Sequence, residues 1–513
     1  MLHICAFAFL SEKAFLFLSI CKKAFLSYPS NSLLTKEFFM NAWPQIIQGG
    51  MGIGVSHWRL ARAVSLTGHI GTVSLVAVPH LLARRLQLGD ATVLRALEAF
   101  PVQEVSDRLY EKYWKKEKTP IPMFSVHPPR DLAWLTICAS FAEVWLAKEG
   151  HNGIVAGNLL EKVQMPTLLT MLGAMWAGID VFIIGAGLPT QIPDILDALC
   201  ENRPARYRIS VLDGGPSQEM TLDIDALLGR VSTSSRQAVR DIQIKRPAFF
   251  PIVSLDVTAH ILWEKMVGRC EGFVVEDPIV AGGHNPSPRK WKGAVNKYDE
   301  PVYTERDIAD IAKISKIGIP FWLAGGYAHP QRLKEAISVG ATGIQCGSIF
   351  ALCEESGISP VWKKELIRQS YQNELIVRSD ARASPTDFPF QVVQMSGTVS
   401  DCAVYENRER ICNLGYLRTP FVTQGKVNYR CPAEPIEDYL HKGGKIEDTI
   451  GRKCLCNNLL STIGLGMTHN SVSEPAIITL GKDTRFIHSL IESENGTYTA
   501  YDAMQYLIGG KSP

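Results

Sequence analysis

His284 is the residue of this chain whose type and position are best suited to catalysis. It follows two glycines, Gly282 and Gly283, shortly after an apolar run that ends at Glu276. An imidazole titrates near neutral pH, so a histidine at the open end of a strand can take or give a proton under ordinary conditions. The chain contains 12 histidines, and a loop histidine without a role is the alternative. The strand-end position favours an active-site base.

Two glycine clusters further along the chain predict a phosphate site. One apolar run ends in Ala324-Gly325-Gly326-Tyr327, and the next ends in Gln345-Cys346-Gly347-Ser348. Glycine lets the backbone approach a phosphate closely and leaves N–H groups free to point at it. Either cluster alone is as well explained by a tight turn. Both together, at the ends of consecutive strands, indicate a phosphate site.

Two more strand ends are free of large side chains. They read Gln48-Gly49-Gly50-Met51-Gly52 and Gly185-Ala186-Gly187. A planar ring system needs backbone without side chains at several strand ends, so that it can lie flat across them. A sugar phosphate would not need so much surface free of side chains. This favours flavin mononucleotide (FMN), and no GxGxxG motif after the first strand supports a dinucleotide-binding Rossmann domain.

The elements that must position these residues alternate between strands and helices. Eight short apolar runs separated by helical patterns predict a parallel (β/α)8 TIM barrel, of class α/β. The predicted strands are residues 45–48, 71–75, 153–159, 181–184, 249–254, 272–276, 320–324 and 343–346. The predicted helices are 58–65, 192–199, 305–314 and 331–339.

Two connections are too long for simple crossovers, namely 77–152 and 202–247. We expect several helices over the barrel mouth in the first, among them 134–147, which reads as apolar on one face. The second contains Leu212-Asp213-Gly214-Gly215, a turn signal. Such insertions commonly decorate the substrate side of a barrel.

We divide the chain into three parts. Residues 1–39 are expected to be a disordered extension or a mispredicted start, with a weak membrane-associating arm as the alternative. Residues 40–379 are expected to form the FMN-binding barrel. After about residue 356 the strand–helix rhythm fades, and residues 380–513 are expected to be a C-terminal accessory module.

Composition excludes some classes of partner. With 53 basic and 51 acidic residues the net charge is +2, which gives no electrostatic case for nucleic acid. No run approaches the roughly 18–20 apolar residues that span a bilayer, so we expect a soluble protein without a membrane partner. The 12 cysteines of a large enzyme are better interpreted as reduced thiols, which points to the cytoplasm.

Four cysteines of the tail, Cys412, Cys431, Cys454 and Cys456, have the ligand type that zinc favours. The spacing is poor, because no CxxC occurs. Buried reduced thiols are the favoured interpretation, and no metal is expected.

The glycine-rich strand ends and the Ala281–His284 motif together resemble the nitronate monooxygenase family, formerly called 2-nitropropane dioxygenases, and the related flavin-dependent enoyl-ACP reductases. The resemblance spans roughly residues 44–357. Residues 157–162 and 451–457 resemble a longer subgroup, which is similar to enoyl-reductase components of polyunsaturated fatty acid and polyketide synthases. Long insertions and Cys346, where the short reductases carry a small aliphatic residue, depart from the pattern and leave the substrate open.

The resemblance implies FMN as cofactor and His284 as base or proton donor. It implies that Gly325, Gly326, Gly347 and Ser348 hold the phosphate. Gly49, Gly50 and Met51 would lie along the flavin, with Asn158 and Gln345 near its polar edge. The full expected cofactor-binding set is Gln48, Gly49, Gly50, Met51, Asn158, Gly185, Gly187, Gly282, Gly283, Gly325, Gly326, Gln345, Gly347 and Ser348.

The implied reaction is oxidation of an alkyl nitronate by molecular oxygen to a carbonyl compound and nitrite. One alternative is an enoyl-ACP reductase in which NAD(P)H reduces FMN and the flavin reduces an enoyl thioester. Another is a non-catalytic, flavin-holding subunit of a lipid-synthase assembly. The oligomeric state, with a homodimer among the candidates, is not readable from the sequence.

Overall fold

The structure is a computed structural model that describes residues 43–212, 215–289, 293–470 and 472–509. Residues 44–513 form one compact unit. The predicted extension, residues 1–39, lies outside the described residues.

Eight parallel strands close into a barrel. Each strand pairs with its neighbours in the order β1-β10-β9-β8-β7-β4-β3-β2, and the ring is completed by a parallel bridge between Ile47 and Ile70. The predicted TIM barrel is confirmed, with all eight strands in the predicted places. The strands are β1 (Ile46–Gln48), β2 (Gly71–Ser74), β3 (Val155–Leu160), β4 (Val181–Gly185), β7 (Ala248–Val253), β8 (Phe273–Glu276), β9 (Phe321–Ala324) and β10 (Gly343–Cys346).

The barrel strands are recognisable in the sequence because they are buried on both faces. Parallel strands covered by helices read as continuous apolar runs rather than as alternating patterns, and every residue of β4 is buried. Glycine occurs where two backbone segments approach each other closely. A Cβ at Gly71 would lie 1.9 Å from the carbonyl oxygen of Ala61, and one at Gly343 would lie 1.7 Å from that of Gln45.

Helices follow the strands around the barrel. The predictions for residues 58–65, 192–199 and 331–339 are confirmed within a residue. The helices and their bounds are α3 (Trp58–Ser65), α8 (Thr167–Trp176), α9 (Ile192–Cys200), α12 (Asp256–Lys265), α13 (Ile311–Ser315), α14 (Pro330–Ser338), α15 (Ser348–Ala351) and α16 (Pro360–Tyr371).

The predicted helix 305–314 is wrong as a single element. The structure has a 3-10 turn, η3 (Glu305–Asp307), and then the short helix α13. Asp307 accepts a hydrogen bond from the Thr304 N–H at 2.7 Å, and Asp310 caps the start of α13. Aspartate side chains that bond nearby N–H groups favour caps and turns over helix interiors, which explains the break.

The first long connection holds the predicted helices: α4 (Val78–Gln87), η1 (Ala91–Val93), α5 (Leu94–Ala99), α6 (Gln103–Tyr113) and α7 (Arg130–Lys148). Two expectations for residues 134–147 are corrected. They are buried on nearly all sides rather than on one face, and α7 packs against α3, α4 and α8 in the outer ring rather than over the mouth. Inside this packing, Glu143 pairs with Arg85 and accepts from the Trp58 N–H at 3.0 Å.

The second long connection holds an antiparallel hairpin, β5 (Ala205–Ile209) and β6 (Gln218–Leu222), followed by α10 (Ile224–Leu228) and α11 (Thr233–Arg240). The turn signal at residues 212–215 falls between the two hairpin strands. Residues 213 and 214 lie outside the described residues.

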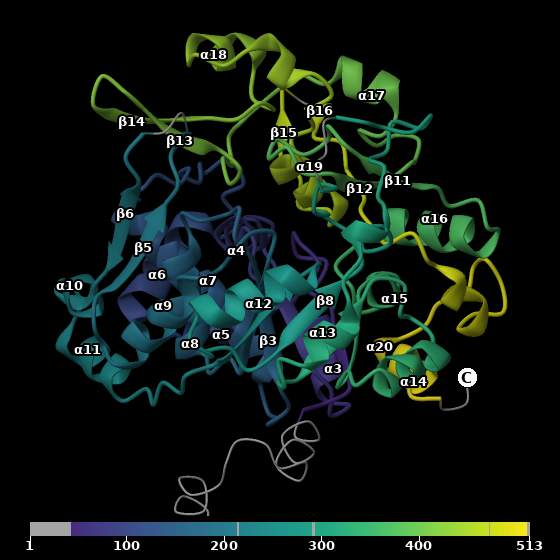
Figure 1. Ribbon diagram of the computed structural model, residues 1–513. Helices are drawn as coiled ribbons and strands as arrows, with labels where there is room; N and C mark the ends of the chain where they lie inside the picture. Colours follow the sequence, from purple (N-terminus) through teal and green to yellow (C-terminus); the bar gives the residue numbers. More distant parts are fainter. Residues whose placement is uncertain (1–42, 213–214, 290–292, 471, 510–513) are drawn as a thin grey trace, which may run out of the picture. The chain divides into compact units, whose positions relative to one another are not determined.

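The C-terminal part packs on the barrel (Figure 1). Most of its elements gather along one side of the barrel in this view, while α20 contacts α3, α14 and α15. Ile477, Ile478 and Phe390 belong to the same buried core as the barrel residues. The boundary at residue 380 stays a prediction. The elements are β11 (Val377–Asp380), β12 (Phe390–Val393), α17 (Cys402–Asn407), β13 (Thr419–Thr423), β14 (Lys426–Arg430), α18 (Ile436–His441), η4 (Ile446–Thr449), α19 (Leu455–Thr462), β15 (Thr468–His469), β16 (Val472–Ser473), η5 (Arg485–Ser489) and α20 (Ala500–Leu507).

Within the described ranges, none of the helices combines the length and the apolar character needed to cross a membrane.

Candidate active site

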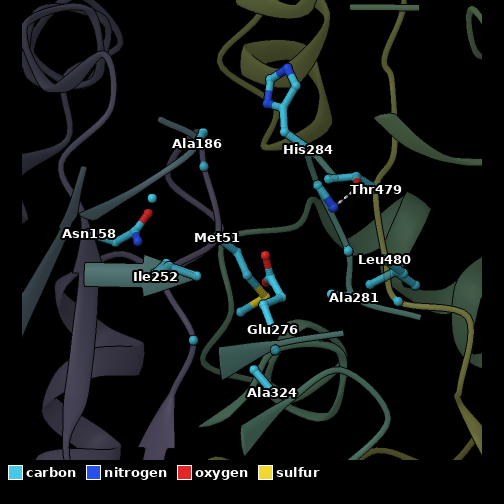
Figure 2. A pocket seen from close by; sticks show the side chains of 18 of the residues that line it. Met51, Asn158, Ala186, Ile252, Glu276, Ala281, His284, Ala324, Thr479 and Leu480 are labelled. Carbon is cyan, nitrogen blue, oxygen red and sulfur yellow. Dashed lines mark hydrogen bonds between the residues drawn. The ribbon is translucent and has the colours of Figure 1, made fainter. Parts of the chain in front are cut away.

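A pocket opens where the carboxyl ends of the barrel strands meet, which is where TIM-barrel enzymes place their sites. Its floor comes from the ends of β1, β3, β4, β7, β8, β9 and β10, and its wall comes from the C-terminal part of the chain. Figure 2 shows Ile252, Glu276 and Ala324 at the strand ends, with Thr479 and Leu480 on a separate segment beside them. The barrel therefore forms only part of the pocket.

All but two of the predicted site residues line this one pocket. They are Gly49, Gly50, Met51, Asn158, Gly185, Gly282, Gly283, His284, Gly325, Gly326, Gln345, Gly347 and Ser348. Gln48 and Gly187 are not among the lining residues. The Gln48 side chain is buried below the pocket, where its Oε1 accepts from the Thr72 N–H at 2.8 Å. It thus ties β1 to β2 where the barrel closes.

The two glycine clusters present free backbone donors to the pocket. Gly325 and Gly326 have φ angles of +90° and +76°, which glycine adopts without strain. Among the described residues, the amides of Gly325, Gly326 and Gly347 have no hydrogen-bond acceptor. Unpaired, half-buried N–H groups that converge on one space suit the oxygens of a phosphate.

The opposite side of the floor fits a planar, polar ring. A Cβ at Gly50 would lie 2.1 Å from the Cβ of Asn158, so glycine is required there for the Asn158 side chain to pass. The Oε1 atom of Gln345 is buried and has no hydrogen-bond partner among the described residues. A buried acceptor without a donor costs about 1–3 kcal/mol, and a ring N–H of a flavin would satisfy it. The residues present therefore fit FMN.

His284 stands on the rim, apart from Glu276 and Met51 at the floor (Figure 2). Its Nε2 lies 2.7 Å from the Ser384 hydroxyl, and Ser384 is also 2.8 Å from the Thr386 hydroxyl. The ring packs edge-on against Phe390, with centroids 4.9 Å apart. These contacts fix the orientation of the imidazole.

Burial lowers the pKa of His284 well below its ordinary value, and the nearby Lys162 lowers it further. Burial also lowers the pKa of Lys162 to about 7, and its Nζ lies 3.4 Å from the centroid of the Phe388 ring. His284 is consequently neutral at physiological pH, which is the protonation state that a general base requires.

Glu276 is a pocket residue to which sequence reasoning assigned no role. It is the last residue of β8, and burial, with a smaller contribution from Asp277, raises the pKa of its carboxyl to about 8. The signal was available, because a carboxylate at the carboxyl end of a barrel strand points toward the mouth. Glu276 places a protonated acid in the pocket at neutral pH.

The wall residues from the C-terminal part were also missed. The Thr479 hydroxyl accepts from the Gly283 N–H at 2.9 Å, and the Ser348 hydroxyl accepts from the Gly481 N–H at 2.9 Å. Tyr416 and Cys456 line the same pocket. No local pattern marks these residues, because their role depends on a fold that brings them back across long stretches of chain.

Comparison with known proteins gives a family match over part of the chain. Residues 251–424 match the family model described as nitronate monooxygenase. A stretch of 51 residues is 37% identical to a probable nitronate monooxygenase from Bacillus subtilis (strain 168), and it covers 10% of this chain and 15% of that protein. The alignment with this relative therefore spans a small share of its length.

Two solved structures show low similarity to this chain. FabK from Thermotoga maritima has 15% identity and a TM-score of 0.38, with 74% of this chain and 78% of that chain covered. The nitroalkane oxidase from Streptomyces ansochromogenes has 13% identity and a TM-score of 0.38, with 92% and 96% covered. The barrel assignment itself rests on the strand pairing described above.

The matched segment carries the ends of β8, β9 and β10, both glycine clusters that were predicted to bind a phosphate, and His284. Over residues 251–424, the chain thus matches the nitronate monooxygenase family, the family that its motifs resemble.

Proposed function

We propose that this protein is an FMN-dependent oxidoreductase of the nitronate monooxygenase type, which converts alkyl nitronates and molecular oxygen to carbonyl compounds and nitrite. One observation carries the proposal. A single pocket contains both the unpaired glycine N–H groups and a neutral histidine whose orientation is fixed by its contacts. The ten described cysteines are all free, which supports a reducing compartment such as the cytoplasm.

Different residues would hold different parts of the cofactor. Gly325, Gly326, Gly347 and Ser348 would hold the phosphate, and the Gly49–Met51 turn would lie along the ring. Gln345 and Asn158 would meet its polar edge. When bound, FMN supplies the electron transfer, and the protein contributes positioning and electrostatics.

His284 accepts the α-proton when the entering substrate is a neutral nitroalkane. Its low pKa keeps the imidazole unprotonated, and the Ser384 hydroxyl bonded to Nε2 holds the ring in place. A substrate that enters already as the nitronate needs no such proton transfer. The role of His284 can therefore be separated from cofactor binding by the choice of substrate.

We expect His284→Ala to lower kcat on a neutral nitroalkane by about 10²–10⁴-fold, the usual contribution of a positioned base. The rate on the pre-formed nitronate should change much less, and the bound FMN should be unchanged. His127, an exposed histidine outside the pocket, provides the matched control His127→Ala. Equal rates of His284→Ala and wild type on the neutral nitroalkane would show that another group is the base.

A second candidate is the enoyl-reductase reaction. Glu276 favours it, because a carboxyl with a pKa of about 8 is a proton donor at neutral pH, and reduction of an enoyl thioester needs one. An absorbance spectrum during anaerobic addition of ethyl nitronate and then NADPH separates the two. Bleaching of the flavin band by the nitronate but not by NADPH supports the monooxygenase, and bleaching by NADPH alone supports the reductase. A flavin that neither reagent reduces would indicate a non-catalytic subunit, and no flavin after reconstitution with FMN would refute all three.

A further inference from the structure

One loop of the C-terminal part orients the imidazole of His284. It consists of residues 381–387 and is termed the Ser384 loop. The Ser384 hydroxyl lies 2.7 Å from Nε2 of His284. The same hydroxyl accepts a hydrogen bond from the Thr386 N–H at 3.2 Å and lies 2.8 Å from the Thr386 hydroxyl. The orientation of the imidazole therefore depends on the conformation of this loop.

The backbone of the Ser384 loop is bound by two successive residues, Arg452 and Lys453. The loop connects β11 to β12 and contains no helix or strand, so its carbonyl groups find partners elsewhere. The side chain of Arg452 donates to the Ser384 carbonyl and, at 3.2 Å, to the Arg382 carbonyl. The N–H of Lys453 donates to the Ala383 carbonyl between them, at 2.9 Å. Arg452 thus binds the carbonyl of the residue whose hydroxyl contacts the imidazole.

Ion pairs attach both ends of the loop to the same two residues. Lys453 pairs at 3.0 Å with Asp380, which directly precedes the loop, and Arg452 pairs with Asp387 at its end. The Arg452 side chain is 10% exposed, whereas that of Asp387 is 78% exposed, and exposed ion pairs contribute little. The Nε of Arg452 also donates to the Asp448 carbonyl at 2.9 Å. The buried hydrogen bonds of a guanidinium that is itself held in place therefore fix the loop.

The backbone of His284 is fixed by other contacts. The Gln391 N–H donates to the Gly283 carbonyl, and the Asn285 N–H donates to the Pro389 carbonyl, both at 2.9 Å. These two bonds flank His284 and involve residues beyond the Ser384 loop. A change in the loop is therefore expected to release the imidazole and to leave the histidine backbone where it is.

The contact at Nε2 decides which ring nitrogen can act as a base. Among the described residues, Nδ1 of His284 has no hydrogen-bond partner. A neutral imidazole carries its hydrogen on one nitrogen, so Nδ1 can accept a proton when Nε2 carries the hydrogen and donates it to the Ser384 oxygen. The Ser384 hydroxyl then donates to the Thr386 hydroxyl. The bond that one ring nitrogen makes selects the state of the other.

We propose that Arg452 is a positioning residue for His284. It binds the Ser384 carbonyl, holds the Ser384 hydroxyl against Nε2, and so keeps Nδ1 free to accept the α-proton of a neutral nitroalkane. The electron pair of the broken C–H bond stays on the substrate as the nitronate. This inference rests on the proposed function. It gives a task to residues 451–457, which lie outside the segment that matches the family model.

The first test compares two substrates in one variant, Arg452→Met, which removes the guanidinium donors. We expect kcat on a neutral nitroalkane to fall about 10–100-fold, because a small displacement of a reacting group is costly. The rate on the pre-formed nitronate and the Kd for FMN should stay unchanged. Arg452→Lys should restore little of the loss, since an ammonium lacks the planar fork that reaches two carbonyls at once.

Arg410→Met is the matched control. Arg410 also donates to backbone carbonyls of the C-terminal part, those of Pro432 at 3.2 Å and Thr449 at 2.8 Å. Neither carbonyl belongs to the Ser384 loop. The ratio of the rates on the two substrates should therefore equal that of wild type. Equal losses on both substrates in Arg452→Met would overturn the proposal, because they would show a general structural effect.

A double-mutant cycle tests the route of the effect. In a His284→Ala background, Arg452→Met should cause no further loss of kcat on the neutral nitroalkane, because residues that act as a unit are not additive. A full additional loss in that background would show that Arg452 acts through another group and would overturn the proposal. If Arg452→Met does not fold, Arg452→Gln replaces it in every measurement, since its shorter amide cannot span the same carbonyls.

Nitrogen NMR of the imidazole reads the tautomer without turnover. In protein labelled with 15N-histidine, the signals of His284 are those that disappear in His284→Ala. We expect the hydrogen on Nε2 in wild type and a mixture of both tautomers in Arg452→Met. Identical signals in the two proteins would overturn the proposal. A tautomer that depends on Arg452 in a protein that does not oxidise nitronates would support the positioning role and refute the proposed reaction alone.

Discussion

Burial shifts the pKa values of His284 and Glu276 in opposite directions, and in both cases it favours the uncharged form of the side chain. It lowers the pKa of the imidazole and raises that of the carboxyl, so both groups are uncharged at neutral pH. A nitronate is an anion, and the neutral carboxyl of Glu276 does not oppose its entry into the pocket. The pocket offers it one neutral base and one neutral acid.

Lys162 influences the pH below which the reaction rate falls. We expect the wild-type kcat/KM for a neutral nitroalkane to hold from about pH 8 down to about pH 6, because His284 stays unprotonated below the ordinary imidazole pKa of about 6.5. Lys162→Met removes a positive charge that lowers the pKa of His284. The pKa of His284 should then rise, and the loss of rate should begin at higher pH. A pH–rate profile identical in both proteins would contradict this coupling.

Glu276 makes the stability of the protein depend on pH. Between its ordinary pKa of 4.5 and its folded value of about 8, the unfolded carboxyl is ionised while the folded one keeps its proton. The folded state then binds more protons, so the free energy of unfolding falls as pH rises through this window. Glutamine cannot ionise. Without FMN, Glu276→Gln should match wild type near about pH 4.5 and exceed it by about 1–3 kcal/mol above about pH 8.

Chemical unfolding at both pH values measures this difference. The control is Glu264→Gln, at an exposed position of α12, which should leave the pH dependence unchanged. A variant curve parallel to that of wild type would show that Glu276 is ionised in the folded protein.

At the scale of elements, the two glycines at opposite ends of β10 have different tasks. Gly343 faces the Gln45 carbonyl where β10 meets β1, whereas a Cβ at Gly347 would have only ordinary contact with Met51, at 3.6 Å. We expect Gly343→Ala to lower the free energy of unfolding by about 3 kcal/mol or more, by overpacking. Gly347→Ala should change it by less than about 0.5 kcal/mol, yet weaken FMN binding about tenfold, because the methyl group enters the phosphate cradle.

Urea unfolding without FMN and a fluorescence titration with FMN measure the two effects separately. An equal loss of stability in both variants would contradict this distinction, in which Gly343 serves the packing of β10 against β1 and Gly347 serves the binding of FMN.

The sequence predicted the barrel well for a physical reason. Strands buried on both faces leave continuous apolar runs, and the strand ends carry glycines that local reasoning can find. The β5–β6 hairpin was missed, although Ala205–Ile209 alternates buried and exposed residues, which is the pattern of a half-covered strand. Ser384 and Thr479 were beyond prediction, because each meets the Gly283–His284 segment only through a contact across 100 positions or more.

At the scale of the molecule, the C-terminal part and the barrel share one core. Phe390, Ile477 and Ile478 are buried together with the barrel residues, and residues 44–513 form one compact unit. We propose that residues 380–513 are an accessory part that stabilises the barrel rather than an independently folding domain.

A chain that ends at residue 379 should therefore fail to show cooperative unfolding, because it exposes the apolar surface that the missing part covers. The full chain should unfold in a single calorimetric transition. Two separate transitions in the full chain, or a stable barrel ending at residue 379, would show that the parts are thermodynamically independent.

The hydrogen bond between the Gly283 N–H and the Thr479 hydroxyl has a consequence for folding during synthesis on the ribosome. It joins residues 196 positions apart, and translation at about 5–20 residues per second leaves roughly 10–40 s between them. Throughout this interval the histidine loop lacks the segment that holds it, and the apolar mouth of the barrel stands open. A nascent chain in this state exposes apolar surface to which chaperones can bind, and a chain that ends before Thr479 lacks the residue that holds the histidine loop.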